Sequence, residues 1–523
     1  MISKIDLPDI QGNIVKAYGR YGFPVARYVF YRINDPTKGR KFVEKVTPLV
    51  TTSVPWEEDS PKLPPVAVNI AFTYQGLKHL DIPDDTLHGF PDEFAMGMKA
   101  RRDIIGDTGP NHFKFWDKIW NDREDEFSQN VHLLIGINAK EEGPLEAAYR
   151  QICGILAATG GVTQLNGHRG ANGAEDLPYQ SAVAGDSDRE HFGYADGIST
   201  SYFEGCRENP RYVVGGGKPT GLDPATAAGW APLAAGEFVL GHADESGAYP
   251  EAPGPPLFSR NGTYMVYRKL HQNVATFRTF VETEGNKFGG VEAFAAKLSG
   301  RWRNGAPLAT FPTEQGANEF VLELDTLLDK SRQGQASDAE KSRLAELRLK
   351  LTAYDYSNDT DGAKCPFGAH TRRTNPRSAL QFGENKPFDT PGALSNRRRI
   401  LRRGLPYGES PENTTDADEH GVIMMIVNAD LSRQFEFVQE QWINYGNDFR
   451  LSNDQDALLG NNGFNENGRG KGRMMIEGDA VAQKPPYFCS GIPTMVETRG
   501  GDYFFVPSMT CLRMIAMGIV DPT

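Results

Sequence analysis

The sequence predicts an α+β fold, because β-rich runs alternate with helical stretches in a regular order. Residues 25–33 form a β-rich run, and a polar stretch with helical character, residues 38–50, follows. Residues 66–80 have the pattern of a strand running into a helix, and residues 131–137 that of a third strand before a helix over 144–158. This order indicates a ferredoxin-like unit with antiparallel strands.

The second half of the chain repeats the pattern of strands followed by helices. Its predicted elements are strands over residues 237–242, 262–270 and 422–430, a helix after each of the last two, and an aromatic-rich strand within 497–508. We therefore expect two ferredoxin-like domains, a duplicated α+β architecture of the dimeric α+β barrel type, over residues 1–225 and 226–523. A charged stretch at about 313–350 is expected to interrupt the second domain as a solvated insertion or an oligomer contact.

Composition narrows the class of protein. The net charge of −12 argues against binding nucleic acid or an anionic membrane through a positive surface. The five cysteines are scattered without a C-x-x-C pair or a C-x-x-C-H motif, which excludes the usual zinc spacings and covalent c-type haem attachment and favours reduced thiols. The N-terminus lacks the apolar region of a signal peptide, and no run reaches the roughly 18 apolar residues of a membrane span. These features predict a cytoplasmic protein; a homo-oligomer is compatible with them.

The segment CPFGAHTRRTNPR, residues 365–377, carries the first candidate site. Pro366 suits a first helical turn and the Asn375-Pro376 pair a helix end, so a helix of about two turns is expected. His370, Arg373 and Arg377 would lean towards one face of it. An imidazole beside guanidinium groups fits a haem whose iron the histidine holds and whose propionates the arginines pair with. A plain surface helix is the alternative.

Two further segments have the residue types that a peroxide-activating haem needs. In EHFGYADGIST, residues 190–200, Asp196 stands between Gly193 and Gly197, which let the backbone turn tightly and approach a flat ring. An ordinary Asx turn explains the same residues. In RRRILRRGLPYG, residues 397–408, Arg402 precedes Gly404 and could stabilise negative charge as an O–O bond breaks, although arginine strings are more often surface charge.

The chain resembles the dye-decolourising (DyP-type) haem peroxidases. The resemblance runs through DIQGNI, NIAFTYQGL, FGYADGIS, RNGTYMVYRKL, CPFGAHTRRTNPR, ILRRGLPYG and TRGGDYFFVPS. It implies a non-covalent haem b, with hydrogen peroxide as oxidant and phenolic, aromatic or dye molecules as donors. By the same resemblance Asp196 is the distal acid–base residue, Arg402 the distal arginine, His370 the iron ligand and Arg377 a propionate partner.

Two positions depart from some members of that family. Gly404 stands where some bacterial members have asparagine, as in the larger members. Val422 and Met424 occupy alternate positions of the strand expected to cover the distal pocket, where leucine and phenylalanine are common. Met424 is oxidisable, which predicts a limit on turnover lifetime.

Several alternatives stay open from the sequence. The acceptor that orients His370 is expected to be Asp430 or Glu436, without a choice between them. Tyr407 and Trp442 are candidates for passing electrons from bulky donors at the surface, or are packed core. A haem-handling protein that stores or delivers haem is the rival function, and a non-haem α+β protein is a second rival. Asp196 and Arg402 argue against a carrier.

Overall fold

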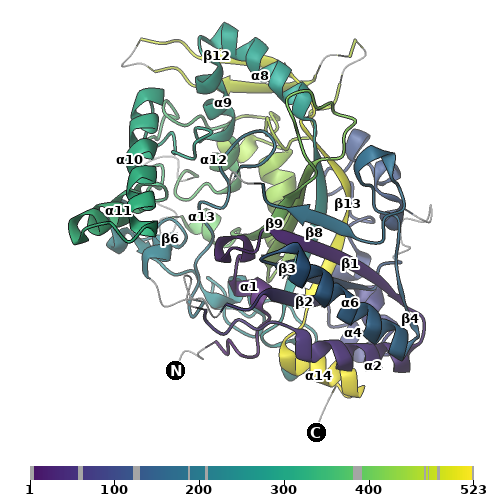
Figure 1. Cartoon of the computed structure of the whole chain (residues 1–523). Helices are drawn as coiled ribbons and strands as arrows, with labels where there is room; N and C mark the ends of the chain where they lie inside the picture. Colours follow the sequence, from purple (N-terminus) through teal and green to yellow (C-terminus); the bar gives the residue numbers. More distant parts are fainter. Residues whose placement is uncertain are drawn as a thin grey trace.

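The computed structural model describes residues 5–56, 63–121, 130–185, 189–206, 210–380, 392–464, 467–468, 470–479 and 483–520. Within them, nine strands form one antiparallel sheet with helices packed around it (Figure 1). No helix of this part of the chain is long and apolar enough to cross a membrane.

The N-terminal half of the sheet has the ferredoxin-like strand order. Strands β1 (Val25–Ile33), β2 (Val66–Phe72), β3 (Leu133–Ala139) and β4 (Val162–Gln164) lie in the order β4-β1-β3-β2. The crossover helices are α2 (Pro36–Val46) and α6 (Glu142–Thr159). Helix α2 starts earlier than predicted because the Asp35 side chain accepts a hydrogen bond from the backbone N–H of Lys38.

The C-terminal half repeats this order. Strands β8 (Thr263–Gln272), β9 (Leu401–Tyr407), β10 (Gly421–Asn428) and β13 (Val496–Val506) lie as β13-β8-β10-β9, so the first strand is again between the fourth and the third. Helix α8 (Val274–Phe288) follows β8. Two π-helical segments, Leu431–Glu436 and Val438–Ile443, follow β10 where a helix was predicted. The predicted fold class of paired ferredoxin-like units is confirmed.

The two halves join into a curved sheet around an aromatic core. The ladder between β2 and β13 pairs Phe72 with Phe505. Strand β5 (Gln180–Val183) pairs with β1 and lies beside β9, so the free edges of the two halves approach each other. Across the interior, the rings of Tyr28 and Tyr267 meet edge-on with centroids 5.8 Å apart. The boundary at residue 225 stays a prediction.

Helices cover the sheet unevenly. The C-terminal helix α14 (Met509–Met517) packs on α2, so the chain end returns to the N-terminal half (Figure 1). The predicted insertion forms a helical hairpin, α10 (Glu314–Arg332) and α11 (Asp338–Lys350), at the edge of the molecule (Figure 1). Ser337 and Glu340 form a capping box that starts α11.

One predicted strand is wrong. Residues 237–242 form no strand; a short 3-10 helix, Ala235–Glu237, precedes turns. The backbone N–H of Val239 returns to the carbonyl of Ala235, and the buried Glu237 carboxylate accepts a hydrogen bond from Arg433 at 2.7 Å. The turn satisfies the backbone locally and places the Glu237 carboxylate against the distant Arg433.

Helix α9 (Val291–Ser299) and the hairpin of β11 (Gly472–Ile476) and β12 (Tyr487–Ile492) are the longer of the remaining elements. The short ones are α1 (Gly12–Val15), α3 (Tyr74–Lys78), α4 (Asp84–Leu87), α5 (Asp92–Met96), α7 (Pro256–Ser259), α12 (His370–Thr374), α13 (Ala393–Asn396), β6 (Lys218–Pro219) and β7 (Trp230–Ala231). Short 3-10 turns connect several of them.

Candidate active site

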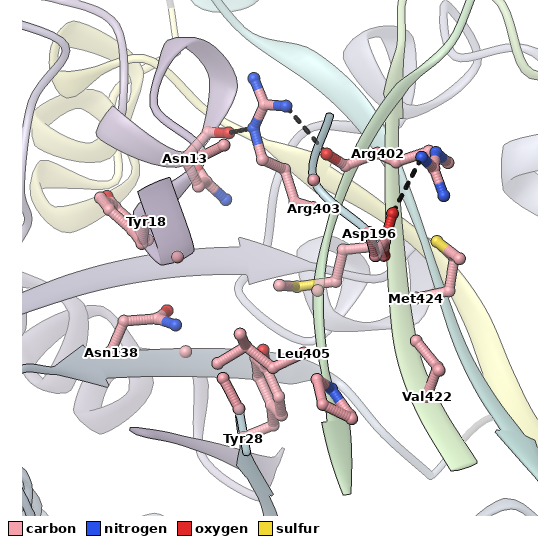
Figure 2. A pocket seen from close by; sticks show the side chains of 18 of the residues that line it. Asn13, Tyr18, Tyr28, Asn138, Asp196, Arg402, Arg403, Leu405, Val422 and Met424 are labelled. Carbon is pink, nitrogen blue, oxygen red and sulfur yellow. Dashed lines mark hydrogen bonds and ion pairs between the residues drawn. The ribbon is translucent and has the colours of Figure 1, made fainter. Parts of the chain in front are cut away.

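A cavity of about 300 Å³ lies against one face of the C-terminal half of the sheet. His370, Arg377, Asp196, Arg402, Val422 and Met424 all line it, so the structure brings together six of the seven predicted site residues. A second cavity of about 370 Å³ adjoins it and shares Asp196, Arg402, Val422 and Met424 (Figure 2). Gly197 lines the second cavity.

His370 is the first residue of α12 and is oriented by a buried carboxylate. Its Nδ1 lies 3.0 Å from Oδ2 of Asp456, which is fully buried. The other oxygen of Asp456 accepts the backbone N–H groups of Leu458 and Leu459 at 2.8 and 2.9 Å. Burial alone would raise the pKa of Asp456, but His370 and these hydrogen bonds hold it below its ordinary value. Nε2 of His370 makes no hydrogen bond within the described residues, leaving it available as a ligand.

The predicted partners of His370 were both wrong. Asp430 caps the following helix through the N–H of Arg433. Glu436 forms a bidentate ion pair with Arg101, and Tyr503 also donates to it. Asp456 stands 86 residues beyond His370 in an irregular segment, and no local pattern marks it as the acceptor.

The helix that carries His370 is shorter than predicted. It spans His370–Thr374, and Pro366 lies in the preceding turn, where its carbonyl accepts the N–H of Ala369. Arg377 therefore lies outside the helix, with φ of 54°. Arg373 does not face the cavity: its guanidinium donates to backbone carbonyls of Trp442, Tyr445 and Asp454 and so fixes the segment leading to Asp456.

Four buried arginines line the cavity; Arg268 pairs with Asp107, and the other three are Arg301, Arg377 and Arg399. These three donate mainly to backbone carbonyls, for example Arg301 to Gly305 and Arg399 to Gly217. No carboxylate of the described residues pairs with any of the three, and the buried Nε of Arg399 has no partner there. Burial and the neighbouring Arg377 lower the pKa of Arg399 to about 9. An anionic ligand would stabilise these buried positive charges by pairing with them.

Asp196 and Arg402, which line both cavities, form an ion pair. Nη2 of Arg402 lies 3.3 Å from Oδ1 of Asp196, and each side chain is about half exposed, at 47% and 52% respectively (Figure 2). Gly193 and Gly197 have φ of 90° and 71°, a left-handed conformation that favours glycine. The two glycines thus allow the bends that present Asp196.

Strands β9 and β10 build the wall around this pair. In their ladder Met424 lies opposite Gly404 and Ile426 opposite Arg402, so these four residues share the cavity face. A Cβ at Gly404 would lie 1.9 Å from the carbonyl oxygen of Ile423. Glycine is therefore required here by close backbone approach, and an asparagine would force the strands apart.

The predicted surface aromatics are buried. Tyr407 is 3% exposed and Trp442 is 1% exposed. Trp442 packs edge-on against Phe437 and Phe449, and its Nε1 donates to Asp448 at 3.0 Å. Both residues belong to the packed interior, so neither offers a surface contact for a bulky donor.

Comparisons with known proteins agree with this geometry. A family model described as the DyP dimeric alpha+beta barrel domain matches residues 9–170. Curated relatives include Peroxidase 2 of Mycetinis scorodonius, 25% identical over 97% of this chain and 87% of its own length, and a dye-decolorizing peroxidase of Mycena epipterygia, 28% identical over 98% and 87%. An ancestral D-type dye decolorizing peroxidase superposes with a TM-score of 0.71, at 25% identity over 98% and 99% of the two chains. Over nearly its whole length the chain is similar to DyP-type peroxidases, and residues 9–170 match the model of their dimeric alpha+beta barrel domain.

DyP-type peroxidases depend on haem, and the residues of this chain fit that group. His370 has a carboxylate behind Nδ1 and an Nε2 that makes no hydrogen bond to the described residues, the arrangement that orients a metal-bound histidine. The buried arginines Arg301, Arg377 and Arg399 lack carboxylate partners in the described part of the chain, and two propionates would supply them. Only Arg377 of these three was predicted. The others were missed because their meeting depends on tertiary contacts.

Proposed function

We propose that this chain reduces hydrogen peroxide and oxidises phenolic, aromatic or anthraquinone-dye donors by one-electron steps, with a non-covalent haem b. One observation carries the proposal: a single cavity is lined by His370, whose Nδ1 is held by the buried Asp456, and by the Asp196–Arg402 pair. In support, relatives are named dye-decolorizing peroxidases, and a structure similar to this chain, 23% identical, is a complex of such a peroxidase with 2,6-dimethoxyphenol.

The proposal gives the residues of one wall the task of holding the cofactor. His370 would ligate the iron through Nε2, with Asp456 fixing its ring and increasing its electron donation. Arg377, with Arg301 and Arg399, would pair with the propionates. When bound, the haem would supply the redox chemistry that divides the oxidation of donors into one-electron steps.

Asp196 and Arg402 would handle the proton and the charge. The Asp196 carboxylate lies 3.3 Å from the Arg402 guanidinium and would serve as the proton acceptor. The Asp196 carboxylate would take a proton from one oxygen of hydrogen peroxide and return it to the other as the O–O bond breaks, so that this oxygen leaves as water; a bound haem would supply the two electrons that the cleavage requires. Arg402 would stabilise the negative charge that develops on the departing oxygen.

The rival function, a protein that stores or delivers haem, has no use for a charged distal pair. The discriminating experiment is peroxide-dependent oxidation of 2,6-dimethoxyphenol by haem-loaded protein, compared with Arg402→Leu and with His370→Ala supplied with haem. We expect turnover in the wild type, a loss of ~10²-fold or more in Arg402→Leu, and loss of both turnover and stable haem binding in His370→Ala. Stable haem with no turnover in the wild type would favour the carrier.

The cellular location and the oligomeric state stand as predictions of the sequence: a cytoplasmic protein, with a homo-oligomer possible. Val422 and Met424, which line both cavities, would form the distal wall over the haem. Gly197 would allow the backbone beside Asp196 to approach the ring.

A further inference from the structure

Glu190 lies six residues before Asp196 and organises the loop between them. Its carboxylate accepts the backbone N–H groups of Phe192 at 3.0 Å and Tyr194 at 2.9 Å. It also accepts a hydrogen bond at 2.5 Å from the side-chain amide of Gln272, the last residue of β8. One carboxylate thus ties two amides of the loop to the C-terminal half of the sheet.

The loop so fixed is also anchored through its own side chains. The ring of Phe192 stacks on Phe277 of α8 with centroids 4.2 Å apart. The Tyr194 hydroxyl donates to the carbonyl of Ala295 in α9 at 2.7 Å. The N–H of Ala195 bonds the carbonyl of Arg303. These contacts hold the approach to Asp196, together with the Arg189 guanidinium, which donates to the carbonyls of Gly193 and Arg303.

The charge of Glu190 is costly where it lies. Burial raises the pKa of Glu190, and the neighbouring Asp196 raises it further. Glu190 also lines both cavities together with Asp196. A neutral or apolar residue would avoid this cost, so stability alone does not explain a carboxylate here. Accepting two diverging backbone N–H groups and the Gln272 amide at once does explain it, because a carboxylate has only acceptor sites.

We propose that Glu190 is a positioning residue that, held by Gln272, sets the loop so that the Asp196 carboxylate meets Arg402. The proposal rests on the proposed function for its kinetic consequence, while its structural consequence is independent of haem. Neutralising Glu190 turns one acceptor oxygen into a donor that opposes a backbone N–H. The loop then loosens and Asp196 moves off its partner.

The structural test is hydrogen exchange of the haem-free protein, followed by mass spectrometry of peptides covering residues 189–201. We expect Glu190→Gln to speed exchange of the Phe192 and Tyr194 amides at least tenfold. Gln272→Leu, which leaves the loop's own carboxylate in place, should speed it less. Glu282→Gln makes the same charge change on the exposed face of α8 and should leave the loop unchanged.

The kinetic test is a double-mutant cycle on the haem-loaded protein. Glu190→Gln should slow the bimolecular reaction with hydrogen peroxide at least tenfold when Asp196 is present and less than twofold in an Asp196→Ala background. A residue that merely supports the fold would slow both backgrounds equally. Haem content and the absorption spectrum of the resting protein should match the wild type.

The outcomes separate this inference from the proposed function. Unchanged loop exchange in both Glu190→Gln and Gln272→Leu, or equal slowing in the two kinetic backgrounds, would overturn the positioning role. If Glu190→Gln does not fold, Gln272→Leu carries both readouts, with a loss of about threefold or more expected. If wild-type protein does not react with peroxide, the proposed function fails, and the exchange data alone decide the role of Glu190.

Discussion

Oδ2 of the buried Asp456 lies 3.0 Å from Nδ1 of His370. The carboxylate is held in turn by the backbone of Leu458 and Leu459, so it cannot rotate away. A histidine held in this way has one nitrogen committed to the protein and the other directed at the cavity. The pair therefore determines the orientation and the basicity of the proposed ligand.

Replacing Asp456 with asparagine should weaken the hydrogen bond to His370 while keeping the size of the side chain. We expect haem affinity to fall by about 10–100-fold and the midpoint potential of the iron to rise, because the histidine donates less electron density. Titration with haem and spectroelectrochemistry measure the two effects. Asp454→Asn is the matched control, because Asp454 pairs with the exposed Arg473 at 2.9 Å. Equal effects from both substitutions would contradict a specific role for Asp456.

Replacing Arg399 should have opposite effects on the stability of the haem-free protein and on its affinity for haem. Its guanidinium is buried without a carboxylate partner among the described residues. Arg399→Leu should therefore leave the stability of the haem-free protein unchanged or raise it, while weakening haem binding about tenfold through loss of a propionate contact. Thermal unfolding without haem and haem titration measure the two. Arg332→Leu on the exposed face of α10 should change neither; haem binding unaffected by Arg399→Leu would remove it from the propionate site.

His370, Asp196 and Arg402 could be predicted from the sequence because each lies in a short segment with its own glycine, proline or arginine signals. Asp456, Arg301 and Arg399 could not, since each is brought to the cavity by contacts between distant segments. The fold class followed from strand and helix order. The wrong strand at 237–242 failed because a buried Glu237 pairs with Arg433, a contact that β-propensity does not encode.

The raised pKa of Glu477 predicts that the stability of the protein depends on pH. It accepts the N–H of Phe367, three residues before His370, and burial raises its pKa to about 7 from 4.5. Since the folded protein binds this proton more tightly than the unfolded chain, the stabilising contribution is complete below pH 4.5 and is lost as the pH rises through 7. Glu477→Gln should raise the free energy of unfolding at pH 8 by ~1–3 kcal/mol and leave it unchanged near pH 4. Thermal unfolding across this range measures it.

The same experiment on Glu282→Gln gives the control for removing one carboxylate from the exposed surface of α8. Its unfolding temperature should follow that of the wild type across the whole range. A Glu477→Gln variant that also parallels the wild type at pH 8 would mean that the Glu477 carboxylate is not strained by burial.

The position of Met424 predicts which methionine is oxidised first when the protein is exposed to peroxide. It lines both cavities beside the Asp196–Arg402 pair, so its thioether is close to where peroxide would react. After repeated peroxide additions to haem-loaded protein, mass spectrometry should find the sulfoxide at Met424 before the buried Met98, and Met424→Leu should prolong turnover. Met517, which is 61% exposed, reports oxidation by bulk peroxide. Oxidation of Met517 with Met424 intact would contradict the prediction.

The most direct test of the central claim is a stopped-flow absorption measurement of haem-loaded protein mixed with one equivalent of hydrogen peroxide, beside Asp196→Ala and Arg402→Leu. We predict a rapid change of the haem spectrum in the wild type, slowed by ~10²–10⁴-fold in Asp196→Ala, with a marked loss in Arg402→Leu as well. Rapid conversion in Asp196→Ala would move the proton-transfer role away from Asp196. A wild type that keeps its haem and shows no spectral change would contradict the peroxidase assignment.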